Sequence, residues 1–417
     1  MKDQDHTGAI CATAEPVDSR SEAFSAEAGP SYPSSRSRNI RSLCTLCSVP
    51  DSAETIHPDN IGVDPDWSGI LATANDHGVA PLICKRVETF TSESMPEIWR
   101  EHYHEEFTRN CCRNLFLASE LLEALAALDK IGVSATPFKG PVLAVQAYGD
   151  LSARQFADLD ILIPQRHVLR ANGALLAAGF QPEMPGSVTV ESDRQIPGQY
   201  AYENANRTRI ELHTERTLRY FPRPLNFDAL CHRRKSIAIA GHSIPSFSPE
   251  DTLILLSVHG SKHFWERLIW IADIAALATN TRLDWVAALD RARDCGTERM
   301  VLLGAGLAHD ALGLSLPSEV ANPMAQDSTV RRLIGQVRAR LFAEHSMELG
   351  LFSRFAFRSR MRGDGITGLR YAIRFAVQPT EWDRSDSRFA GRLEPLNALV
   401  RPFRLARDYG WRSRVKR

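Results

Sequence analysis

The segment DLDILI, residues 158–163, constrains the fold most, because acidic and apolar residues alternate at its start. Successive side chains of a strand point to opposite faces, so Asp158 and Asp160 share one face, and Leu159 and Ile161 share the other. We therefore predict a strand with one buried face and a carboxylate pair on the opposite face. Two neighbouring carboxylates repel each other unless a cation lies between them, and Mg²⁺ or Mn²⁺ binds through such oxygens.

The periodicity of the remaining chain predicts an α+β fold, in which a small mixed sheet is flanked by N-terminal and C-terminal helical regions. Strand and helix patterns alternate in the sheet region, and NANR, residues 204–207, is typical of a hairpin turn. Ser248, Pro249 and Asp251 form a helix start, and we predict one long helix from there to about residue 278. The expected regions are a disordered tail (1–38), an N-terminal helical region (39–132), the α/β core (133–247), a helical domain packing on it (248–320) and a basic, partly helical C-terminal region (321–417).

Composition gives little support for a membrane-spanning protein or for zinc or redox chemistry. The 417 residues carry zero formal net charge, which gives no general argument for nucleic acid or an anionic membrane as partner. From residue 351 onward, however, sixteen basic residues face six acidic ones. The eight cysteines are scattered, and a lone CxxC at Cys44 and Cys47 is weak support for zinc or redox chemistry. Without an apolar run of about 20 residues that could span a membrane, we expect a cytoplasmic protein.

A phosphate-binding element is expected just before the aspartate pair. Gly140 follows Lys139 at the point where a strand passes into a short helix, and its missing side chain would let backbone N–H groups approach a phosphate. Lys139 would add a positive charge near the same phosphates, and Arg154 would add a forked donor. The sequence thus predicts Lys139, Gly140 and Arg154 as nucleotide-binding residues.

A third carboxylate is predicted on a later strand. Glu211 lies in RIELH, where Ile210 and Leu212 take the opposite face, so it can complete a catalytic and metal-binding trio with Asp158 and Asp160. His213 should share the face of Glu211.

Other polar residues are weaker candidates. His259, Lys262 and His263 occur on the predicted long helix, and together with His213 they are candidates for contacting the acceptor or supporting the catalytic residues. The two helix histidines are four residues apart, but a zinc site there is less expected than ordinary polar positions. Asp273 could touch substrate or form a structural salt bridge. Trp265, Trp270 and Trp285 are expected to pack rather than to stack on bases.

The ordered set of Lys139, Gly140, Tyr148, Arg154, Asp158, Asp160 and Glu211-Leu212-His213 resembles a known family. It is similar to the bacterial uncharacterised nucleotidyltransferase group, within the superfamily of DNA polymerase β and kanamycin nucleotidyltransferase. The resemblance covers about residues 60–320. It departs from the superfamily pattern because Pro141, not serine or glycine, follows Gly140, and because seventeen residues separate Gly140 from the acids.

The resemblance implies an enzyme that uses Mg²⁺ or Mn²⁺ to move a nucleoside monophosphate from an NTP to a hydroxyl of an acceptor. Related chains point to polysaccharide or peptide natural-product biosynthesis, so the acceptor could be a small molecule, sugar, peptide or protein. Two alternatives stay open: a catalytically inactive nucleotide-binding adaptor in a biosynthetic complex, and a toxin-like nucleotidyltransferase acting on tRNA. The choice of NTP and the oligomeric state cannot be read from the sequence.

Overall fold

The computed structural model describes residues 36–49, 58–62, 64–91, 94–183, 198–214, 222–223, 226–343 and 349–363, and residues 368, 400 and 403. Internal contacts divide the chain into Met1–Ser34 and Ser35–Arg417, and every described residue belongs to the second unit. The tail predicted for residues 1–38 therefore lies outside the described residues, except for its last three, which begin helix α1 (Arg36–Leu46). Most of the C-terminal basic region also lies outside them.

A five-stranded mixed sheet carries the aspartate pair. The strands are β1 (Thr136–Pro137), β2 (Asp158–Leu162), β3 (Gln181–Pro182), β4 (Gln199–Glu203) and β5 (Arg209–His213), in the order β1-β2-β5-β4-β3. Strands β2 and β5 are parallel and the other pairs are antiparallel. The register places Asp160 opposite Glu211. The predicted α+β fold with a small mixed sheet is confirmed.

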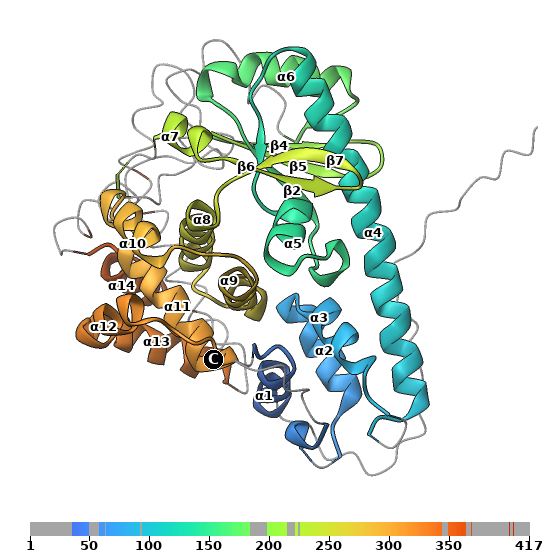
Figure 1. Cartoon of the computed structure of the whole chain (residues 1–417), viewed down its shortest axis with the longest axis vertical. Coiled ribbons are helices and arrows are strands. Elements are labelled where there is room, and N and C mark those ends of the chain that lie inside the picture. Colours follow the sequence, from blue (N-terminus) through green and yellow to red (C-terminus); the bar gives the residue numbers. More distant parts are fainter. Residues whose placement is uncertain are drawn as a thin grey trace, which may run out of the picture. The chain divides into compact units, whose positions relative to one another are not determined.

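The two faces of the sheet have different environments. Leu159, Ile161, Ile210 and Leu212 are almost fully buried on one face, in an apolar cluster that includes residues of α4 (Glu97–Lys130) and α6 (Val168–Ala177). Figure 1 shows α6 and the long helix α4 against this part of the fold. Burial of these apolar side chains fixes the register, because a slip of one residue would turn the carboxylates into the core.

Two hairpins complete the sheet region. Strands β4 and β5 are joined by the turn at 204–208, which confirms the predicted hairpin. A second hairpin, β6 (Lys235–Ile239) with β7 (His242–Ser246), forms a separate two-stranded sheet that we did not predict. Its turn residues Ala240 and Gly241 both have positive φ, at 49° and 82°. Helix α7 (Phe227–His232) precedes it.

Helices make up the flanks, as predicted. Before the sheet come α1, α2 (Trp67–His77), α3 (Ala80–Val87) and α4, with the short 3-10 helix η1 (Pro58–Ile61). Within the core lie α5 (Gly140–Tyr148), η2 (Leu151–Ala153), η3 (Gln165–His167) and α6. After it come α8 (Pro249–Lys262), α9 (Leu268–Asn280), α10 (Trp285–Asp294), α11 (Glu298–Leu312), α12 (Ser318–Gln326), α13 (Ser328–Leu341) and α14 (Leu351–Arg360). None of the described helices has the length and apolar character needed to cross a membrane.

The long helix predicted from Ser248 to about residue 278 is wrong in one respect. It starts as expected, with Ser248 Oγ accepting a hydrogen bond from the Asp251 backbone N–H at 3.3 Å. It then divides into α8 and α9, because Phe264 and Trp265 adopt positive φ values of 59° and 57°. The Trp265 indole is fully buried, and a Cβ on Gly260 would come within 2.5 Å of its ring. Packing of this indole therefore decides the chain reversal, and it confirms Trp265 as a core residue.

Cys44 in α1 and Cys47, directly after the end of α1, are both buried free thiols. Burial, which is the main cause, raises the pKa of the Cys44 thiol to about 12. Both cysteines contribute to the larger apolar cluster, in line with a packing role.

Candidate active site

The acidic site forms where β2 and β5 run side by side. Asp160, Glu211 and His213 each offer a ligand atom, and these atoms lie within 4.8 Å of one another. The parallel register brings Asp160 beside Glu211, and the two-residue period of β5 puts His213 on the same face as Glu211. The carboxylate pair and third acid predicted from the sequence are thus on neighbouring strands.

Asp160 is the centre of this cluster. Its side chain is 1% exposed, and Oδ1 lies 2.6 Å from Lys139 Nζ and 2.8 Å from His213 Nε2. Burial favours the protonated carboxyl, but the charges and hydrogen bonds of Lys139 and His213 outweigh it, so the pKa of Asp160 lies well below its usual value. Asp160 is therefore ionised.

The second oxygen of Asp160 has a different environment. Among the described residues, Oδ2 is buried and has no hydrogen-bond partner. A buried carboxylate oxygen without a donor is costly, and a cation would remove that cost. This atom is the strongest sign that the site is built to receive a cation.

Asp158 occupies a different electrostatic environment on the same strand face. It is half-buried, at the first position of β2. Burial, and then the negative charge of Asp160, raise the pKa of Asp158, and Lys139 partly offsets them. The two aspartates thus have pKa values displaced in opposite directions, the pattern expected when like charges share a site.

Glu211 and His213 form the β5 side of the site. Gln199 Nε2 donates to Glu211 Oε2 at 2.6 Å, and Arg209 lies 3.3 Å from Oε1. Burial, the largest single cause, would raise the pKa of Glu211, but the His213 hydrogen bond and the positive charges of His213 and Lys139 together outweigh it, so the pKa is lowered. For His213, burial opposes the charged form, yet hydrogen bonds to Asp160 and Glu211 raise its pKa. The raised pKa favours the protonated form of His213, and only the neutral imidazole can bind a metal ion.

These residues fit a divalent cation by their chemistry. Carboxylates of Asp160 and Glu211 are hard oxygen ligands, and the free Oδ2 atom supplies a ligand position. Asp158 lies outside the set whose ligand atoms are within 4.8 Å, but it is electrostatically coupled to both other acids.

Lys139 and Gly140 lie at the start of α5, directly beside β2. Lys139 is the N-cap, and Gly140 is the first helical residue, with φ of +55°. A Cβ on Gly140 would lie 3.2 Å from the Asp158 carbonyl oxygen. Glycine is therefore required here by the fold itself, since the helix start lies directly against the strand that carries the aspartates.

Arg154 lies in a buried ion pair rather than at the open edge of the site. Its Nε and one terminal nitrogen donate to the two oxygens of Asp273 at 2.9 and 3.0 Å. The Tyr148 hydroxyl donates to Asp273 Oδ1 at 2.9 Å. Of the two roles considered for Asp273, the structural salt bridge is the one observed. The cluster links the end of α5 to α9.

A histidine pair follows at the junction of α8 and α9. The His259 and His263 rings are 4.7 Å apart, and Trp270 lies 5.6 and 5.2 Å from them. Burial is the main cause that lowers the pKa of His263 to about 4 and the pKa of His259 well below its usual value. The positive charge of Lys139 contributes to both lowered pKa values. Lys262 ends α8 beside them.

Two contacts of the site were missed from the sequence, those of Gln199 and Arg209 with Glu211. The hairpin register pairs Gln199 with His213, and Arg209 precedes Glu211 by two residues on β5. Applying the alternation rule to both strands of the predicted hairpin could have placed both side chains on the acidic face.

Comparisons with known proteins give the family. A model of the family described as "Uncharacterised nucleotidyltransferase" matches residues 64–313, more than half of the 417 residues. Among solved structures, the chain is similar to an antigenic nucleotidyltransferase-like protein from Paracoccidioides brasiliensis, with 16% sequence identity, a TM-score of 0.30, and coverage of 49% of this chain and 96% of that one. A search of curated proteins found no match. By the extent of the family match, the chain belongs to the uncharacterised nucleotidyltransferase family.

Proposed function

We propose that this protein is a divalent-metal-dependent nucleotidyltransferase that moves a nucleoside monophosphate from an NTP to a hydroxyl group of an acceptor. The observation that carries the proposal is the buried Asp160 carboxylate beside Glu211, with one oxygen lacking a protein donor. Family membership supports the reaction class.

The phosphates of the NTP would lie at the start of α5. The first N–H groups of a helix are unpaired and the helix dipole favours negative charge there. Lys139, 14% exposed at this end, would exchange part of its contact with Asp160 for a phosphate oxygen. Arg154 donates to Asp273 through Nε and one terminal nitrogen. In the proposal its positive charge favours the ionised form of Asp158. Its other terminal nitrogen would contact a phosphate.

Mg²⁺ or Mn²⁺ would be held by Asp158, Asp160 and Glu211, with Asp160 Oδ2 as a ligand atom. When bound, the metal would neutralise charge on the triphosphate and polarise the bond to be broken.

The chain's own residues orient the transfer. The acceptor hydroxyl oxygen forms a bond to the α-phosphorus, the bond from that phosphorus to the β-phosphate oxygen breaks, and pyrophosphate leaves. We assign Glu211 to orient the hydroxyl and accept its proton, because its side chain is 14% exposed whereas Asp160 is 1% exposed. Gln199 and His213 hold the Glu211 carboxylate in place. The His259, Lys262 and His263 group would border the acceptor, which could be a small molecule, a sugar, a peptide or a protein.

One observation favours a second candidate, a nucleotide-binding adaptor without catalysis. The Lys139 ammonium already neutralises Asp160, with Nζ 2.6 Å from Oδ1. In addition, Pro141 occupies the position where the superfamily pattern has serine or glycine. In the adaptor, the Lys139–Asp160 pair would persist when a nucleotide binds.

The test combines binding and turnover. Each of the four NTPs is titrated calorimetrically with and without Mg²⁺ into the wild type, an Asp158→Ala/Asp160→Ala variant and a control variant of the exposed Asp129, Asp129→Ala. Magnesium-dependent binding that only the double variant loses is expected for the enzyme. Pyrophosphate release with candidate acceptors then separates the enzyme from the adaptor, which would bind and never release it. Retained turnover in the double variant would refute the metal assignment.

A further inference from the structure

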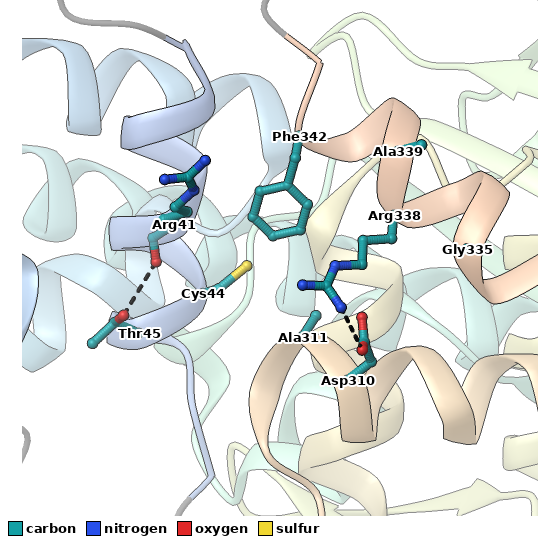
Figure 2. A pocket seen from close by; sticks show the side chains of 9 residues that line it. All are labelled: Arg41, Cys44, Thr45, Asp310, Ala311, Gly335, Arg338, Ala339 and Phe342. Atoms are coloured by element: carbon teal, nitrogen blue, oxygen red, sulfur yellow. Dashed lines mark hydrogen bonds and ion pairs between the residues drawn. The ribbon is translucent and has the colours of Figure 1, made fainter.

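A groove of about 600 Å³ lies between α1, α11 and α13, lined mainly by residues of these helices and by Phe342. No residue of the acidic site lines it. Figure 2 shows Phe342 and the Cys44 thiol between the helix that carries Arg41 and the helices that carry Arg338 and Asp310. A volume of this size falls in the range of pockets for small organic ligands, roughly 300–1,000 Å³.

The lining of this groove is cationic on balance. Arg41 and Arg338 contribute two positive charges and Asp310 one negative charge. Arg338 donates to Asp310 Oδ1 at 2.9 Å, and Arg41 donates to Ser37 at 3.3 Å. A guanidinium has five N–H donors, so each arginine keeps donors for an anion after these single bonds. Arginines from two different helices can bind one phosphate from both sides.

Phe342 and small residues form the apolar part of the groove. Phe342 is half-buried and presents a flat apolar wall. Gly335 occupies the interior of α13, where glycine costs about 1 kcal/mol relative to alanine. A Cβ added there would meet no atom within 4 Å, so no protein contact explains the glycine. Because Gly335 lines the groove, a larger side chain at this position would reduce its volume.

We propose that this groove is a second ligand site, which binds a nucleoside phosphate without a metal ion. The phosphate lies between Arg41 and Arg338, and the base packs against Phe342. The acidic site needs a cation between its carboxylates and the nucleotide, whereas the groove supplies its positive charge from arginine, so the two sites differ in their metal requirement.

The test measures AMP binding in EDTA by calorimetry, with the full chain as wild type and as Asp158→Asn/Asp160→Asn. We expect one AMP per chain with equal affinity for both proteins. Gly335→Leu should weaken binding at least tenfold by filling the groove, while Gly173→Leu, at another exposed helix glycine with open space, should not. Arg41→Ala should weaken binding severalfold, and Arg332→Ala, exposed on the same helix as Arg338, should not change it.

Adenosine and inorganic phosphate are the probes for the two halves of the groove. Each should bind at least tenfold more weakly than AMP, because each can use only one half. The proposal is overturned if AMP does not bind at millimolar concentration in EDTA, or if Gly335→Leu binds it like the wild type. Loss of binding in the Asp158→Asn/Asp160→Asn protein would also overturn it by moving the ligand to the acidic site. None of these results bears on magnesium-dependent binding there, which is measured separately.

Discussion

Removal of the Asp273 carboxylate should destabilise the protein strongly. Asp273 is fully buried and accepts three hydrogen bonds, two from Arg154 and one from Tyr148. In Asp273→Ala, the Arg154 guanidinium, whose residue is 7% exposed, stays buried without its anion. Breaking one half of a buried ion pair costs about 3–5 kcal/mol, because the remaining charge is left uncompensated. Tyr148→Phe removes one hydrogen bond to a charged group and should cost about 1.5–3 kcal/mol.

Urea unfolding followed by circular dichroism measures these losses, and a double-mutant cycle tests their cause. Arg154→Met/Asp273→Leu removes both charges and should be more stable than Asp273→Ala by about 2 kcal/mol or more, since apolar replacement of a buried pair is often nearly neutral. Lys85→Ala is the matched control, because its pair with Asp150 is 52% and 31% exposed and should contribute about 1 kcal/mol or less. A cost below about 1 kcal/mol for Asp273→Ala would refute the reasoning that this pair is buried and mutually required.

Three further results are expected. Gly140→Ala should lower the free energy of unfolding by about 1–2 kcal/mol because of its φ of +55°, and by more because the added Cβ would contact the Asp158 carbonyl. Gly149→Ala, with φ of +67° and no atom within 4 Å, should show only the cost of the backbone conformation in the same urea assay. Equal costs for the two variants would contradict the contact. The pKa of His263 is lowered to about 4 in the folded protein, so the unfolded chain takes up the proton first as pH falls. The free energy of unfolding should therefore decrease as pH drops from 6.5 toward 4. His263→Gln should reduce this pH dependence of the urea midpoint. The pKa of Asp158 is raised, and a metal ion binds only the ionised carboxylate. The calorimetric affinity for Mg²⁺ and NTP should therefore fall as pH falls through that pKa. A pH-independent affinity would contradict the assignment of Asp158 to the metal.

Local patterns predicted much of the fold. The alternation in residues 158–163 correctly separated the acidic from the apolar face, because the two-residue period of a strand is independent of its neighbours. The Ser248 cap is likewise a short-range interaction, and the structure has it. The second hairpin was missed because Ala240 with Gly241 is a weaker turn signal than the asparagines of 204–207.

Long-range packing accounts for the errors. Helical periodicity continues through residues 248–278, yet the chain reverses at Phe264 and Trp265. The Trp265 indole is buried against Gly260 in α8 and against Gly304 in α11, which is distant in the sequence. Arg154 and Asp273 are 119 residues apart, and no local pattern relates them. Such pairs are set by how the helices pack on the sheet, which spacing alone does not specify.

Lys139 shows how the predicted residues and the resting structure fit together. From the sequence we predicted that Lys139 binds phosphates, while in the structure its Nζ lies 2.6 Å from Asp160 Oδ1. Both follow from one constraint: an ionised Asp160 that is 1% exposed requires a nearby cation whenever no other one is present. A metal ion on Oδ2 would supply that charge and free the Lys139 ammonium, which sits at the N-cap of α5, for an incoming triphosphate. Under the proposed function, the same lysine would stabilise Asp160 before the metal binds and contact a phosphate afterwards, so its removal should weaken both the fold and nucleotide affinity.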